Sequence, residues 1–158
     1  MEMSRVPFVS MSRMLLRQDT IKLLRECDAG IQMGINSIND VLPYVHAKDM
    51  KTCLNRCKAD HNKLELEIQG QLQRFGDNGK APNPLLSGMS WMKTNVKLVL
   101  NESDATIAEL MTDGCNMGVK SLSRYLNQYK AADEVSKDIT KRLIQQEEQL
   151  SKNMQSYL

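Results

Sequence analysis

Side chains at four positions of this sequence are candidate ligands for a transition metal, and their spacing brings two of them together. Cys57 and His61 stand four residues apart, which places them on one face of a helix. Thiolate sulfur and imidazole nitrogen are common zinc ligands, and a carboxylate such as Glu147 can complete such a set. With Cys27 on a neighbouring predicted helix, these residues are candidate ligands for a single Fe or Zn ion. No catalytic residue and no organic cofactor are predicted.

The sequence favours a structural interpretation of the same residues over a metal site. His61 and Glu147 each fall in the middle of an apolar stripe, so both side chains should point into the core. A buried carboxylate is costly unless it is paired and hydrogen-bonded. The two side chains could therefore satisfy each other as a buried polar pair, and free cysteines are commonly buried without any metal.

Four apolar stripes with the period of an α-helix must position these residues. They run from Leu23 to Val45, from Met50 to Phe75, from Ile107 to Tyr129 and from Val135 to Leu158. Helices of about 25 residues with one apolar face are typical of helical bundles. The sequence therefore predicts an all-α fold.

The ends of the predicted helices carry recognisable signals. Pro43 should end or bend the first helix, and Asp49 is a candidate N-cap for the second. The second helix should stop at the run Gly76 to Gly79, and Asp133 should open the fourth. Between the second and third helices, Asn83-Pro84 begins a short apolar stripe from Leu85 to Val99, which predicts a long helical crossover that carries Trp91.

Composition and charge narrow the class of protein. The chain has 158 residues, a formal net charge of +2 and no apolar run long enough to cross a membrane, so neither nucleic acid nor a membrane is an expected partner. Four cysteines within helical patterns suggest reduced thiols and a cytoplasmic location. Residues 1–16 are expected to form a loose N-terminal tail, and residues 17–158 a single domain.

The first and third helices share a repeated segment. Gly30–Leu42 and Gly114–Leu126 have identical Gly, Met, Gly, Ser and Leu residues at aligned positions. Arg56–Leu64 aligns less strongly with Arg142–Leu150, and this alignment places His61 opposite Glu147. The chain thus reads as two helical hairpins of common design joined by a crossover, the connectivity of ferritin-like four-helix bundles.

On these residues the sequence resembles the ferritin-like superfamily, and in particular the small bacterial ferritin-like proteins of unknown function. The resemblance rests on GIQMGINSI and GCNMGVKSL, on ADHNKL, and on PNPLLSGMSWMKTNVKL before the third helix, and it covers residues 18–158. It implies a four-helix bundle, and homodimerisation is expected because bundles of this kind often pair through an exposed apolar face.

The di-iron members of that superfamily use one Glu from each of two helices and a Glu-x-x-His motif from each of the other two. This chain lacks most of that set. Lys58 precedes His61 where Glu is expected, and Leu150 follows Glu147 where His is expected. Glycines occupy the middle of the first and third helices, and the nearest acids, Glu26 and Glu109, lie at least a turn away. A ferroxidase is not expected.

The glycines Gly30, Gly34, Gly114 and Gly118 need an explanation of their own, because a mid-helix Gly costs about 1 kcal/mol relative to Ala. One interpretation is close packing of two helix backbones, with the first and third helices antiparallel. The other is a small cavity that a ligand fills.

Three functions follow from these alternatives. The first is a non-enzymatic protein that acts by self-association or by binding an unknown protein partner. The second is a metal-binding or redox protein with a mononuclear or degenerate site around His61 and Glu147. The third is a carrier of a small ligand, with its cavity bounded by the four glycines.

Overall fold

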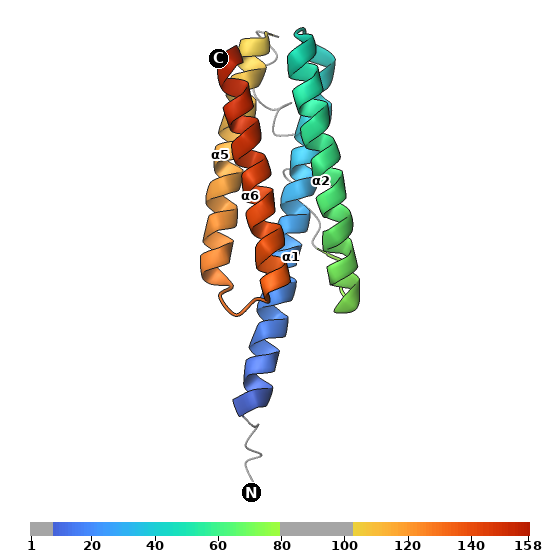
Figure 1. Cartoon of the computed structure of the whole chain (residues 1–158), viewed down its shortest axis with the longest axis vertical. Helices are drawn as coiled ribbons and strands as arrows, with labels where there is room; N and C mark the ends of the chain where they lie inside the picture. Colours follow the sequence, from blue (N-terminus) through green and yellow to red (C-terminus); the bar gives the residue numbers. More distant parts are fainter. Residues whose placement is uncertain (1–7, 80–102) are drawn as a thin grey trace, which may run out of the picture.

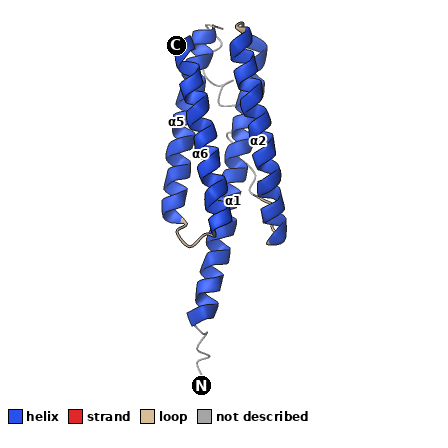
Figure 2. Ribbon diagram, viewed as in Figure 1, coloured by secondary structure: helices blue, strands red, loops and turns tan. Residues whose placement is uncertain are grey.

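The computed structural model describes residues 8–79 and 103–158, and these residues form four long α-helices (Figure 1). The helices are α1 (Phe8–Val41), α2 (Lys48–Arg74), α5 (Asp104–Gln128) and α6 (Glu134–Met154), with short 3-10 helices at Leu42–Tyr44 and Gln155–Tyr157. Figure 2 shows helix and loop throughout this part of the chain. The predicted all-α fold is confirmed.

The helices form a bundle in which α1 runs antiparallel to α2, and α5 runs antiparallel to α6 (Figure 1). α1 packs on α2 and α5 packs on α6, so each half of the chain is a helical hairpin. The hairpins meet where α2 packs against α6 and where α1 packs against both α5 and α6. α2 ends and α5 begins at opposite ends of the bundle, so these two helices run in the same direction. The predicted crossover helix and Trp91 lie outside the described residues.

Most of the predicted helix ends are where the sequence signals place them. Leu42–Tyr44, which contains Pro43, forms a 3-10 turn directly after α1. The Asp133 carboxylate accepts a hydrogen bond from the Ser136 N–H at 2.8 Å and so caps α6.

Asp49 is not the N-cap of α2, and this prediction is wrong. The cap position is Ala47, and Asp49 lies within the first turn. The reason is a carboxylate from another helix. Asp104, at the start of α5, accepts hydrogen bonds from the backbone N–H groups of His46 and Ala47 at 2.8 and 2.9 Å. This contact ties the beginnings of α2 and α5 together.

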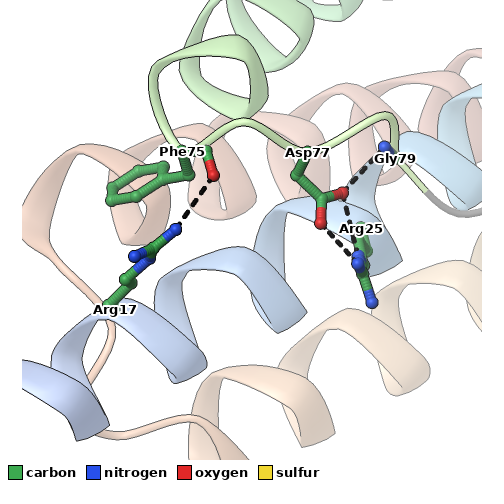
Figure 3. Close-up of polar contacts among 5 residues, drawn as sticks. All are labelled: Arg17, Arg25, Phe75, Asp77 and Gly79. Carbon is green, nitrogen blue, oxygen red and sulfur yellow. Dashed lines mark hydrogen bonds and ion pairs between the residues drawn. The ribbon is translucent and has the colours of Figure 1, made fainter.

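The turn after α2 is fastened to α1 by two arginines (Figure 3). Gly76 and Gly79 have positive φ angles of 67° and 84°, as the glycine run predicts for a helix stop. Arg17 donates to the Phe75 carbonyl at 3.1 Å, and Arg25 forms an ion pair with Asp77. The Asp77 carboxylate also accepts the Gly79 N–H at 2.8 Å, which closes the turn.

Residues 8–16 differ from the loose tail that was expected for residues 1–16. They form the first turns of α1, which extends past the other helices (Figure 1). The segment has no Pro or Gly, and five of its nine residues are Met, Leu or Arg, which are good helix formers, so α1 continues outward past its packed part. Met11, Met14 and Leu15 are each more than half exposed there.

Two apolar clusters fill the bundle, one toward each end. One includes Ile38, Cys57, Cys115 and Leu150, and the other includes Ile31, Leu64, Leu122 and Leu143. On each helix the two clusters are separated by about two turns, and the residues between them are Gly34, His61, Gly118 and Glu147. A polar layer therefore crosses the middle of the core. None of the described helices is long and apolar enough to span a membrane.

Candidate functional site

The central layer of the bundle is built around a contact between His61 of α2 and Glu147 of α6. His61 is 1% exposed, and its Nε2 donates to Glu147 Oε1 at 3.0 Å. The Glu147 side chain is 13% exposed, so it lies between the core and the surface. The predicted buried polar pair is confirmed, and it joins the two hairpins.

Cys57, one helical turn before His61, contacts the other side of the imidazole ring. Its sulfur lies 3.8 Å from His61 Nδ1. Burial alone would lower the pKa of His61, but the contacts with Cys57 and Glu147 favour the charged ring and raise that pKa to about 10. At neutral pH, His61 and Glu147 therefore form an ion pair.

Two glycines provide the space that the His61 and Glu147 side chains occupy. A Cβ atom at Gly34 would lie 3.0 Å from two atoms of the His61 ring. A Cβ atom at Gly118 would lie 3.4 Å from Glu147 Oε2. In each hairpin, the second glycine of the repeated segment thus faces the polar side chain of its own hairpin.

Gly30 has a different environment. A Cβ atom placed there would find nothing within 4 Å. Close packing of backbones does not explain this glycine, because another helix in contact would lie within that distance. Open space lies beside α1 at this level.

That space is part of a cleft of about 330 Å³ between α1 and α5. The four glycines that the repeat brings together all line it, and so do Met33, Met111 and Met117. His61 and Glu147 reach it from α2 and α6 and form its polar floor. A volume of this size is at the lower end of the range of about 300–1,000 Å³ for ligand pockets.

A second groove lies on the opposite pair of helices, between α2 and α6. It has a volume of about 390 Å³ and polar walls that include Arg142, Gln146 and Asn153. Cys57 lines this groove, whereas His61 lines the cleft. Because these two residues are in contact, the polar layer reaches the α1–α5 side through His61 and the α2–α6 side through Cys57.

The four candidate metal ligands are not equally placed. Cys57, His61 and Glu147 form a chain of contacts, but Cys27 belongs to the other apolar cluster, where its sulfur contacts the Thr140 hydroxyl at 3.2 Å. Burial raises the pKa of the Cys27 thiol to about 12. Within residues 8–79 and 103–158, no group of three His, Cys, Asp or Glu side chains is arranged to hold a metal ion.

Sequence reasoning missed Cys115 as a member of this layer. Cys115 lines the cleft, as Glu147 does. Burial and the charge of Glu147 raise the pKa of Cys115, so its side chain stays a protonated thiol. Its position directly after Gly114 in the repeated segment was the available signal.

A second polar centre was also missed. Asp28 of α1 is 1% exposed, and its carboxylate accepts hydrogen bonds from Gln32 and Gln69 at 2.8 and 3.0 Å. Glu65 of α2 accepts another hydrogen bond from Gln69 at 2.9 Å. Burial and the neighbouring Asp28 raise the pKa of Glu65 to about 7. Asp28 follows Leu24 by one turn, so its proximity to the apolar stripe was visible in the sequence.

Comparisons of the chain with protein-family models, curated proteins and solved structures give no match.

Proposed function

We propose that this protein is a non-enzymatic binding protein and that the α1–α5 cleft is its ligand site. The observation that carries the proposal is the open space at Gly30 above a polar floor of His61 and Glu147. Apolar walls with a few convergent polar groups are the usual composition of a small-molecule site. The floor is held in place by contacts from four helices, so the site is formed before a ligand arrives.

The scaffold we propose is a ferritin-like bundle of two repeated hairpins with a crossover between α2 and α5. Two observations support it. α2 and α5 run in the same direction, as a crossover requires (Figure 1). Gly34 faces His61 in one hairpin, and Gly118 faces Glu147 in the other, which matches the alignment of the two repeats.

The proposed site is tested with a neutral probe, 1-hexanol, and with protein whose methionine methyl groups carry ¹³C. Titration should shift the methyl signals of Met33, Met111 and Met117, which line the cleft, and leave those of Met50 and Met154 in place. A Gly30→Leu variant should abolish the shifts by filling the open space. The matched control is Gly70→Leu, since Gly70 also has open space but does not line the cleft.

The proposal fails if hexanol shifts none of the cleft methionines, or if Gly30→Leu leaves the shifts unchanged. Metal binding is a separate outcome of the same preparation. Stoichiometric Fe or Zn in the purified protein, lost in a His61→Gln variant, would favour the metal-binding interpretation instead.

Self-association is a second candidate function, and the outer part of α1 favours it. Met11, Met14, Leu15 and Leu16 are 44–54% exposed on a helix that extends past its neighbours. Apolar surface of this kind commonly marks a protein interface. We propose a homodimer that pairs through this face. We also propose a cytoplasmic location, because the free thiols suit a reducing compartment. Sedimentation should show a dimer that a Met14→Lys, Leu15→Lys double variant converts to a monomer.

A further inference from the structure

Two free cysteines line the groove between α2 and α6, and they differ in the group that contacts the sulfur. Cys53 Sγ accepts a hydrogen bond from the neutral side-chain amide of Asn153 at 3.3 Å. Cys57 Sγ, one helical turn further along α2, lies 3.8 Å from Nδ1 of His61. The two thiols thus share one groove, and one of them is paired with an imidazole ring.

The second contact of that ring places Cys57, His61 and Glu147 in the order of nucleophile, base and orienting acid. Nε2 of His61 contacts Glu147 Oε1 at 3.0 Å, so Nδ1 is the ring nitrogen that faces the sulfur. Gly34 packs against the same ring, since a Cβ atom there would lie 3.0 Å from it. A thiol beside a base that a third group holds in place is the arrangement that activates cysteine as a nucleophile.

The ring presents a charged donor to the sulfur. In the ion pair of His61 and Glu147, both ring nitrogens carry protons, so the N–H at Nδ1 donates to Cys57 Sγ. The carboxylate contacts the ring at Nε2 and therefore does not stand between this N–H and the sulfur. A donor on a charged ring stabilises negative charge on sulfur more than a neutral amide does.

The α2–α6 groove gives small molecules access to this sulfur. Cys57 is 8% exposed, and the groove has a volume of about 390 Å³. The described part of its lining carries charges of both signs, with Arg56 and Arg142 beside Asp60. A small neutral reactant fits such a groove, because it needs no charged partner in the lining.

We infer that Cys57 is a redox-reactive thiol and that its reactant is a hydroperoxide, of which hydrogen peroxide is the simplest. The thiol first releases its proton to solvent in the groove. The thiolate sulfur then attacks one peroxide oxygen, and the O–O bond breaks as the S–O bond forms. The leaving hydroxide takes the Nδ1 proton of His61 and departs as water. Sulfur is oxidised by two electrons, the peroxide is reduced, and Cys57 becomes a sulfenic acid.

The test compares the cysteines within one protein sample that is treated with hydrogen peroxide near neutral pH. Dimedone traps the sulfenic acid, and peptide mass spectrometry gives the rate at each position. Cys53 is more exposed than Cys57, so exposure alone predicts that Cys53 reacts first. We expect instead that Cys57 reacts about tenfold faster than Cys53, the factor that one charge-assisted hydrogen bond supplies.

A variant of the ring tests its role. His61→Gln replaces the charged donor with a neutral amide, so the rate at Cys57 should fall about tenfold while the rate at Cys53 stays the same. The matched control is His46→Gln, because His46 is exposed and does not line the groove. This control should leave both rates unchanged.

The inference is wrong if Cys53 reacts as fast as Cys57 in the unmodified protein, or if Cys57 forms no sulfenic acid. An unchanged rate at Cys57 in a folded His61→Gln variant also overturns it. If that variant fails to fold, the order of the two cysteines in the unmodified protein still decides the question. Cys57 lines the α2–α6 groove, so none of these results depends on ligand binding in the α1–α5 cleft.

Discussion

The core of this bundle contains two polar centres with opposite combinations of charge. In the central layer, a cationic His61 from one hairpin meets an anionic Glu147 from the other at 3.0 Å. In the Asp28–Glu65 centre, two carboxyl groups of the same hairpin lie together and share the amide of Gln69. One centre joins the two hairpins, and the other joins the two helices of a single hairpin.

The two centres avoid an unbalanced buried charge in different ways. His61 keeps its proton because Glu147 and Cys57 favour the charged ring. Glu65 keeps a proton up to about pH 7 because burial and Asp28 disfavour a second negative charge. The difference shows that a polar residue near an apolar stripe can be balanced by an oppositely charged partner or by a bound proton. The ion pair of His61 and Glu147 is the centre that lines the cleft.

The largest expected effect comes from removing one partner of the central pair. Glu147→Ala leaves the buried His61 ring without its partner, and loss of one member of a buried pair costs about 3–5 kcal/mol of unfolding free energy. Urea unfolding measures this loss. Glu148→Ala, at the adjacent exposed position, should change stability by no more than about 0.5 kcal/mol. Equal stability of the two variants would contradict a buried ion pair.

The two centres should make stability depend on pH in different degrees. The central layer, through His61, should have the larger effect. The pKa of His61 is about 10 in the folded protein, against an ordinary value of 6.5 for a solvated histidine, so the native state binds more protons between these limits. Its contribution is complete below about pH 6.5 and is lost as the pH rises toward 10, with a magnitude on the order of a few kcal/mol. Urea unfolding of the unmodified protein between pH 6.5 and 9 should show this decline. A His61→Gln variant with the same slope would rule out His61 as its source.

Crowding of the central pair should have a smaller effect. Gly34→Ala places a methyl group 3.0 Å from the His61 ring, which Glu147 and Cys57 hold on both sides. Overpacking of this kind costs about 1–3 kcal/mol, and the gain in helix propensity offsets up to about 1 kcal/mol of it. Gly118→Ala meets Glu147 at 3.4 Å and should cost less. Thermal unfolding of the two variants would contradict this order if Gly118→Ala were the less stable.

The like-charged centre should become more stable when one acid is neutralised. The raised pKa of Glu65 means that its stabilising contribution is complete below about pH 4.5 and is lost as the pH rises through about 7. Glu65→Gln removes this loss, so above pH 7 the variant should be more stable by about 1 kcal/mol, allowing for partial solvent screening. Asp113→Asn, an exposed position on α5, serves as control. A Glu65→Gln variant that is less stable above pH 7 would show that Glu65 is ionised without penalty.

The sequence predicted the helices and the central pair because both depend on periodicity. The apolar stripes locate α2, α5 and α6 closely, and alignment of the repeats placed His61 opposite Glu147, the residue that it contacts. The cap of α2 could not be predicted in this way. It depends on Asp104, which is far from Ala47 in the sequence and contacts it only because the helices pack together.

The cleft could not be derived from the glycines alone. Mid-helix glycines allow either contact between two backbones or space between them, and the choice depends on how far other side chains hold the helices apart. Here Gly34 and Gly118 accommodate His61 and Glu147, whose side chains come from α2 and α6 and occupy the middle of the bundle. Gly30 then borders open space, which depends on the spacing of whole helices and not on any local pattern.

The smallest predicted effect tests the central claim most directly, because it distinguishes an open cleft from packed backbones. The measurement is the unfolding free energy of Gly30→Ala beside that of Gly70→Ala, an exposed position on α2 with the same open surroundings. If the cleft is open, both variants should gain up to about 1 kcal/mol from helix propensity. A Gly30→Ala variant destabilised by more than about 1 kcal/mol, beside a stabilised Gly70→Ala, would show that α1 and α5 touch at this glycine and would contradict the account.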